Sequence, residues 1–364
     1  MNHLFTPLKI GHLTLENRVV IAPMCQYSAD EGAATDWHTL HLGRLALSGA
    51  GLLILEAAAV NPTGRITYAD LGLWDDRTEL ALAQSLAVAR RYSNIPIAIQ
   101  LSHAGRKAST QKPWDGGNFI AADAQNGWPP VAPSALPFTV DGPIPDELSV
   151  KDIVNILEDF TAAAKRAERL GIDAIEIHAA HGYLIHQFLS PLSNTRDDQY
   201  GGNLENRMRF LLDVVDRMLA VISDKMTLGV RISATDWVDG GWDLGQSIIL
   251  AQALAAKGCH FIHVSTAGLS SQQQIPVAPG FQVPFAEAIK QAVDIPVIAV
   301  GLIDNPKVAD EIIASGKADA VALARGILYN PHWVWHAAAE LGQQVTAPPQ
   351  YLRSSPHGIP SPFK

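Results

Sequence analysis

Two imidazoles and a phenol lie close together in segment 175–183, which reads IEIHAAHGY. The first half of this segment alternates apolar and polar residues, as a strand with two different faces does, so Glu176 and His178 point to one side. A glycine follows His181, which predicts that the strand has ended and a loop has begun. Two imidazoles can hydrogen-bond one carbonyl oxygen, and the nearby phenol of Tyr183 can donate a proton. The segment therefore predicts a site that activates a carbonyl compound.

The same two histidines could instead bind a metal ion, since their spacing occurs in metal sites. No nearby cysteine or acidic cluster completes a coordination set, so zinc is the lesser alternative and we predict no metal.

Two other predicted strands carry a polar residue within an apolar run, Gln100 and Arg231. A buried guanidinium needs an anionic partner. That partner could be Glu176, in a salt bridge, or a ligand that becomes negatively charged, such as a reduced flavin. Gln100 offers both a donor and an acceptor, which matches the alternating edge of a flavin pyrimidine ring.

Glycines follow the last two predicted strands, at Gly301 and Gly326, and Arg325 precedes the second of them. In an eight-stranded barrel the loops after strands seven and eight commonly bind phosphate through backbone amides. Glycine lets the backbone approach closely, and arginine adds a fixed positive charge. This pattern favours a ligand that carries a phosphate.

Short β-like runs alternate with longer amphipathic stretches along the whole chain, after an opening that resembles a hairpin at residues 8–17. The predicted strands are residues 19–24, 52–58, 96–101, 174–178, 228–232, 261–265, 296–300 and 320–324. The predicted helices include residues 80–91, 153–170, 207–222, 247–257, 285–292 and 307–315. Alternation of this kind predicts a (β/α)8 TIM barrel rather than an open doubly wound sheet. Two long irregular segments, 107–147 and 265–284, would follow strand carboxyl ends and form the walls of a pocket.

Composition places the chain among globular proteins, with 48% hydrophobic and 17% charged residues and a net charge of 27 − 36 = −9. No long run of either sign occurs, so we expect neither nucleic acid nor a membrane as partner. Only two cysteines occur, which excludes a disulfide framework or a cysteine-bound cluster and favours the cytoplasm. We see no linker, and therefore expect a single domain over residues 1–364.

Long ordered motifs in this chain resemble those of the Old Yellow Enzyme family of flavin-dependent ene-reductases, nearly from end to end. The motifs are HAAHGYLIHQFLSPLSN at 178–194 with YGG at 200–202, APMCQY at 22–27, HAGRK at 103–107 and PGFQVP at 279–284. The first of these positions in the chain, Cys25 with Tyr27 two residues later, resembles the corresponding motif of the thermophilic-like subclass. The resemblance implies a barrel that binds FMN non-covalently, with NADPH as the reductant and NADH as the alternative.

The resemblance also implies a role for each matching residue. His178 and His181 would hold the substrate oxygen, Tyr183 would donate the proton, and Tyr27 and Lys107 would contact the substrate region. Hydride would come from flavin N5. The residues implied in cofactor binding are Pro23, Met24, Cys25, Ala57 or Ala58, Gln100, Arg231, Gly301, Arg325 and Gly326.

The expected activity is NADPH-dependent reduction of an activated C=C bond in an α,β-unsaturated carbonyl compound or nitroalkene. One alternative is a reductase of nitro compounds, nitrate esters or quinones on the same scaffold. Others are a non-catalytic flavin-binding sensor or carrier, and a flavin-free aldolase, for which Lys107 is the only plausibly placed Schiff-base lysine.

The C-terminal sequence PPQYLR, ending at Arg353, resembles a subclass feature in which an arginine reaches the substrate site of the neighbouring subunit. This implies a homodimer or homotetramer with the extension 341–364 at the subunit interface. The chain departs from the pattern because it continues through residues 354–364.

Overall fold

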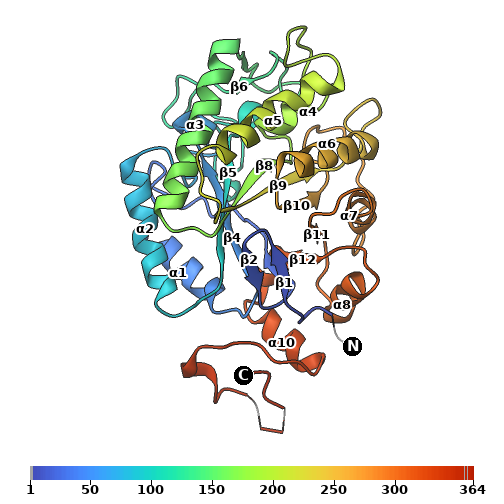
Figure 1. Ribbon diagram of the computed structural model, residues 1–364. Helices are drawn as coiled ribbons and strands as arrows, with labels where there is room; N and C mark the ends of the chain where they lie inside the picture. The colour runs from blue at the N-terminus through green and yellow to red at the C-terminus, as the bar shows by residue number, and fades with distance from the viewer. Residues whose placement is uncertain (1–2, 356, 359) are drawn as a thin grey trace.

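Eight parallel strands close into a barrel, in the order β3-β4-β5-β8-β9-β10-β11-β12 (Figure 1). The computed structural model describes residues 3–355, 357–358 and 360–364. The strands are β3 (Val19–Ile21), β4 (Leu52–Ala59), β5 (Ile97–Ser102), β8 (Ala174–Ala179), β9 (Thr227–Ser233), β10 (Phe261–Ser265), β11 (Val297–Val300) and β12 (Ala320–Leu323). The predicted TIM barrel is confirmed, because β12 pairs with β3 and leaves no open edge.

Helices surround the barrel, and each of the six predicted ones is present. They are α2 (Asp76–Arg90), α3 (Val150–Arg169), α5 (Leu204–Leu219), α6 (Leu244–Lys257), α7 (Val283–Lys290) and α8 (Pro306–Ala314). Four more are α1 (Asp36–Ala46), α4 (Leu184–Leu189), α9 (Arg325–Tyr329) and α10 (Trp333–Glu340). Helix α2 begins before the predicted residue 80, because the Asp75 side chain accepts a hydrogen bond from the amide of Thr78 and caps it.

The sequence analysis named no helix over α1. Trp37 and Leu40 are 50% and 69% exposed, so apolar residues occur on the outer as well as the buried side of this helix. Such a distribution blurs the one-sided pattern by which a surface helix is recognised.

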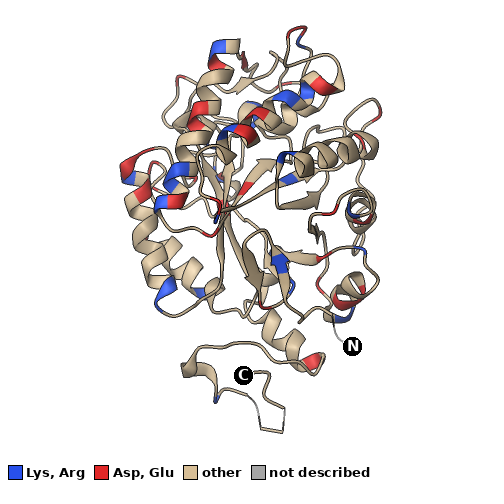
Figure 2. Ribbon diagram, viewed as in Figure 1, with Lys and Arg blue, Asp and Glu red and all other residues tan. Residues whose placement is uncertain are grey.

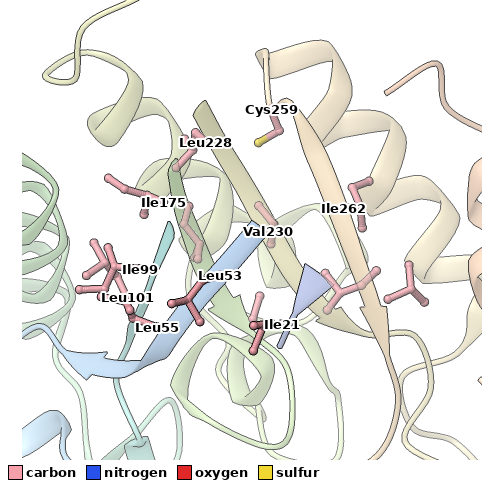
Figure 3. Close-up of a cluster of buried hydrophobic side chains, with 14 of the residues drawn as sticks. Ile21, Leu53, Leu55, Ile99, Leu101, Ile175, Leu228, Val230, Cys259 and Ile262 are labelled. Atoms are coloured by element: carbon pink, nitrogen blue, oxygen red, sulfur yellow. The ribbon is translucent and has the colours of Figure 1, made fainter. Parts of the chain in front are cut away.

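Alternate strand residues separate two apolar regions. Residues such as Ile21, Leu53, Ile99, Ile175 and Ile262 face outward and pack under the helices (Figure 3). The inward residues of the lower barrel form a second cluster of their own.

An N-terminal hairpin covers the amino-terminal end of the barrel, as predicted. It consists of β1 (Leu8–Ile10) and β2 (Leu13–Leu15), and its Ile10 and Leu15 belong to the inward apolar cluster. The hydroxyl of Thr227, at the start of β9, donates to the carbonyl oxygen of Ile10.

The long segment 107–147 begins at the last residue of the 3-10 turn η2 (Gly105–Lys107). It contains a second 3-10 turn, η3 (Pro113–Asp115), and the paired strands β6 (Val131–Ala132) and β7 (Asp146–Glu147). It is therefore an ordered wall above the carboxyl ends of β5 and β8.

The C-terminal segment lies on the side of the β1–β2 hairpin, below the barrel in Figure 1. Thr346 donates to a carboxylate oxygen of Glu16 at 2.7 Å, and Val345 forms a β-bridge with Phe363. Charges of both signs alternate along α3 and α5, whereas this segment carries few (Figure 2). Within the described ranges, no helix is both long and apolar enough to cross a membrane.

Candidate active site

Strand β8 and the turn after it bring His178, His181 and Tyr183 together. The ring centroids of His178 and His181 lie 5.2 Å apart, and those of His178 and Tyr183 lie 5.0 Å apart, both edge to face. His181 adopts a left-handed φ of 57°, which turns the chain so that Tyr183 begins α4 from the same side. The three residues predicted to be catalytic are thus neighbours in space.

These three side chains are held in their neutral forms. Burial, and after it the positive charge of Arg231, hold the pKa of His178 and of His181 well below the ordinary imidazole value. Burial raises the pKa of the Tyr183 phenol well above its usual value. At neutral pH each imidazole therefore keeps one N–H, and the phenol keeps its proton.

Ser233 on β9 and Ser265 on β10 orient His181. Nε2 of His181 and the hydroxyl of Ser265 are hydrogen-bonded at 2.8 Å, and the Ser233 hydroxyl accepts from the backbone amide of His181 at 2.9 Å. Nδ1 of His178 is buried without a partner in the part of the chain that the structure describes. The His181 imidazole is thus fixed by protein, whereas one nitrogen of His178 is buried without a partner among the described residues.

Arg231 lies between His178 and His263 in the sheet register. Its Nε atom is buried and makes no hydrogen bond to any described residue. The two carboxylate oxygens of Glu176 are taken by Nε2 of Gln100, at 2.7 Å, and Nδ1 of His263, at 2.8 Å. Among the described residues Glu176 therefore acts on Arg231 through its field, and the alternative of a direct salt bridge is not observed.

The end of β3 supplies Pro23, Met24 and Cys25, all partly buried. The Cys25 thiol contacts the backbone amide of Ala57 and the hydroxyl of Tyr27, and burial raises its pKa well above the usual value. The predicted strand extended to residue 24, but β3 ends at Ile21, because Pro23 has no N–H to donate to a ladder.

Only one of the two alanines proposed on β4 faces the site. The register shifts between Leu55 and Ala57, which places Ala57 beside Gln100. Ala58 packs in the outer apolar cluster under the helices. The local bulge therefore selects Ala57 as the residue near Cys25.

Gly301, Arg325 and Gly326 line one pocket of about 230 Å³ at the carboxyl ends of β11 and β12. A Cβ atom on Gly301 would lie 2.6 Å from Nε2 of Gln282, and one on Gly326 would lie 2.4 Å from a carboxylate oxygen of Asp304. The positive φ of 127° also favours glycine at position 301, whereas a side chain at position 326 would require the Asp304 carboxylate to move.

Gln282 and Ser265 are site residues that the sequence analysis did not single out. The Gln282 side chain donates to the carbonyl oxygen of Val300 and accepts from the hydroxyl of Thr266. Gln282 could have been identified from the sequence because it lies within the PGFQVP motif. Ser265 is distinguished only by its position at a strand end.

Lys107 is partly buried beneath Tyr183. Its ammonium donates to the carbonyl oxygens of His181 and Gly268, and lies 5.1 Å from the Tyr183 ring centroid. Burial lowers its pKa to about 8. These contacts assign it first to holding the loops of the site, while direct contact with a substrate remains a prediction.

Arg353 does not join the other predicted residues. It is exposed on the C-terminal segment, on the hairpin side of the barrel, whereas the site lies at the carboxyl ends of the strands. No group of three or more metal-ligating side chains is present in the described ranges.

The residues present fit a flavin mononucleotide. Arg231 and His178 each hold a buried nitrogen without a partner among the described residues, and Gln100 is hydrogen-bonded to Glu176, whose charge acts on Arg231. The glycine-lined pocket with Arg325 suits a phosphate.

Comparison with known proteins leads to the same class. Residues 3–344 match the model of the NADH:flavin oxidoreductase / NADH oxidase family. The chain is 44% identical over 358 residues to NADH:flavin oxidoreductase FG08077 of Gibberella zeae, covering 94% of this chain and 86% of that protein. It is 42% identical over 352 residues to an NADPH dehydrogenase of Bacillus subtilis, covering 96% and 98%.

Solved structures agree. Morphinone reductase superposes with a TM-score of 0.77 at 30% identity, covering 100% of this chain and 96% of that one. A 2-naphthoyl-CoA reductase complex has a TM-score of 0.81 at 24% identity, which supports the fold alone, and the chain spans about half of that protein, 51%. The chain belongs to the NADH:flavin oxidoreductase / NADH oxidase family, that is, the Old Yellow Enzyme family. It is an oxidoreductase.

Proposed function

We propose that the protein is an FMN-dependent ene-reductase, which uses NADPH to reduce the activated C=C bond of α,β-unsaturated carbonyl compounds or nitroalkenes. The observation that supports this most directly is the grouping of neutral His178 and His181 with protonated Tyr183 beside the unpartnered Arg231. An oxygen-binding pair next to a proton donor is what reduction of a conjugated alkene requires.

The two histidines bind and orient the substrate. N–H groups of His178 and His181 donate to the carbonyl or nitro oxygen, which withdraws electron density from the β-carbon. Neutral imidazoles suit this task, because they donate without giving up the proton. Tyr27, whose hydroxyl contacts the Cys25 thiol, would contact the same oxygen.

Tyr183 supplies the proton to the α-carbon. Its raised pKa keeps the phenol protonated until negative charge develops on the substrate. When bound, FMN supplies the hydride, and it is held non-covalently. Pro23, Met24, Cys25, Ala57, Gln100 and Arg231 would hold the ring system, and Gly301, Arg325 and Gly326 would hold the phosphate.

A single domain, a homodimer or homotetramer, and a cytoplasmic location complete the proposal. Arg353 enters the substrate site of the neighbouring subunit. Its exposure, and its position away from the site of its own chain, support a role in trans.

The test follows the flavin absorbance of the purified protein under anaerobic conditions. NADPH should bleach the yellow colour, and 2-cyclohexenone should then restore it. Bleaching without recovery would favour nitro compounds or quinones as the acceptor. A colourless protein that takes up no FMN would overturn the proposal.

A further inference from the structure

Four polar side chains cross the barrel interior between the apolar lower cluster and the candidate active site. They are Gln100 on β5, Glu176 on β8, Arg231 on β9 and His263 on β10, and we refer to them as the polar layer. Glu176 and His263 are completely buried. A carboxylate in such a place is costly unless it is hydrogen-bonded and its charge is balanced.

Glu176 organises this layer by hydrogen bonds. One of its oxygens accepts from the side-chain amide of Gln100 at 2.7 Å, and the other is bonded to Nδ1 of His263 at 2.8 Å. The NH2 group of Gln100 is therefore turned toward Glu176. Its carbonyl oxygen is left available as an acceptor for a ligand above the layer.

Glu176 also balances the charge of Arg231. Nε of Arg231 is buried with no acceptor among the described residues, and Glu176 is the carboxylate whose charge acts most strongly on its guanidinium. Before any cofactor is reduced, the two charges offset each other. Hydride transfer brings two electrons and one proton to a flavin, so a bound flavin then gains one negative charge within this neutral layer.

We propose that Glu176 is a positioning residue that fixes the amide of Gln100 and lowers the reduction potential of the bound flavin by opposing Arg231. This inference rests on the proposed FMN site. The field of the carboxylate disfavours the negative charge that reduction adds, and burial strengthens that field. A lower potential makes the reduced flavin a stronger hydride donor to the alkene.

The test is the two-electron midpoint potential of the FMN-loaded protein, measured by equilibration with a reference dye. Glu176→Gln keeps the shape of the side chain but removes its charge. We expect it to favour the reduced flavin by at least tenfold, which is about 30 mV for a two-electron couple.

Asp236→Asn is the matched control. Asp236 is also a buried carboxylate paired with a histidine, at 2.8 Å from Nε2 of His186, but it lies outside the polar layer. We expect its potential to stay at the wild-type value. A change below tenfold in Glu176→Gln, a fall in potential, or an equal rise in Asp236→Asn would overturn the inference.

A double variant covers the case in which Glu176→Gln does not fold or does not retain FMN. Glu176→Gln with His263→Gln replaces the pair by two amides that can hydrogen-bond each other, and the same rise of at least tenfold is expected. Wild-type protein that binds no FMN would instead overturn the proposed function, so the two failures are distinguishable.

Discussion

The ammonium of Lys107 lies 2.9 Å from the carbonyl oxygen of His181 and 3.0 Å from that of Gly268. One side chain thereby joins the turn after β5 to the loops that follow β8 and β10. The backbone that Lys107 holds has a conformation that is unfavourable for a residue other than glycine, since His181 has a left-handed φ of 57°. The position of the His181 imidazole, which we propose binds the substrate, thus depends on a lysine that precedes it by a long stretch of sequence.

Replacing Lys107 by methionine should impair turnover more than cofactor binding. The two lost hydrogen bonds let the His181 loop shift, and misplacement by about 1 Å can cost on the order of 100-fold in rate. We expect kcat for 2-cyclohexenone to fall at least tenfold, with FMN affinity within threefold of wild type. Lys151→Met, at an exposed position on α3, is the control. An unchanged kcat in the Lys107 variant would contradict a positioning role.

Tyr183→Phe should separate the two half-reactions. Removal of the phenol leaves Arg231 and the phosphate pocket untouched, so FMN binding and NADPH oxidation persist. Loss of a general acid typically costs about 100-fold or more. Stopped-flow measurement should show normal reduction by NADPH and slow reoxidation by the enone. Wild-type reoxidation would remove Tyr183 as the proton donor.

Arg325→Gln should weaken binding of FMN but not of riboflavin. Arg325 lines the glycine pocket, and a hydrogen bond to a charged group contributes roughly 1.5–3 kcal/mol, or about ten- to a hundredfold in affinity. Riboflavin lacks the phosphate and serves as the internal control. Both affinities can be measured by quenching of flavin fluorescence as apoprotein is added. Equal losses for the two ligands would place the phosphate elsewhere.

The stability of the protein should fall with acid in a manner that depends on His103. Burial lowers the pKa of His103 to about 3, below the value near 6.5 of an unfolded chain. The unfolded state therefore binds a proton first as the pH falls. The contribution of this group is complete above pH ~6.5 and is lost toward pH ~3, at about 1.4 kcal/mol per pH unit.

Urea unfolding between neutral pH and mild acid checks this prediction. In His103→Gln the amide can still accept from the backbone N–H of Gly105, as Nδ1 of His103 does at 3.1 Å, but it does not titrate. The slope of unfolding free energy against pH should become shallower by roughly that amount. His357→Gln, at an exposed position, is the control, and parallel curves for His103→Gln and wild type would refute the assignment.

The role of Arg353 in trans can be tested by mixing subunits. Arg353→Ala and Tyr183→Phe proteins should each be impaired, the first through substrate affinity. A hybrid contains one site with Tyr183 from one chain and Arg353 from the other. The activity after mixing should therefore exceed the sum of the activities of the two separate variants. Simple additivity would argue against a shared site.

Local pattern was enough to predict the strands and much of the site. Alternation in β8 placed Glu176 and His178 on one inward face, and the structure has them there. The partners of these residues could not be read locally. Ser265 meets His181, and His263 meets Glu176, only because the curvature of the barrel brings side chains of β10 within reach of β8 and its loop, with β9 between the two strands.

Small irregularities of the backbone could not be predicted from the sequence either. The register shift in β4 decides that Ala57 rather than Ala58 lies near Cys25, and nothing in a run of alanines signals it. The structural task of Lys107 depends on two backbone carbonyl groups, which every residue possesses. The pattern of side chains along the sequence therefore does not predict such contacts.

The hairpin beneath the barrel has a consequence for the order of events in the reaction. Ile10 and Leu15 are at most 1% exposed and close the amino-terminal end of the barrel. A ligand of the polar layer must therefore enter from the rim formed by the carboxyl ends of the strands. Under the proposed function, a nicotinamide donor and an alkene acceptor enter through this same rim and use the same flavin, so we expect them to bind in turn. Excess of either one should therefore slow the cycle.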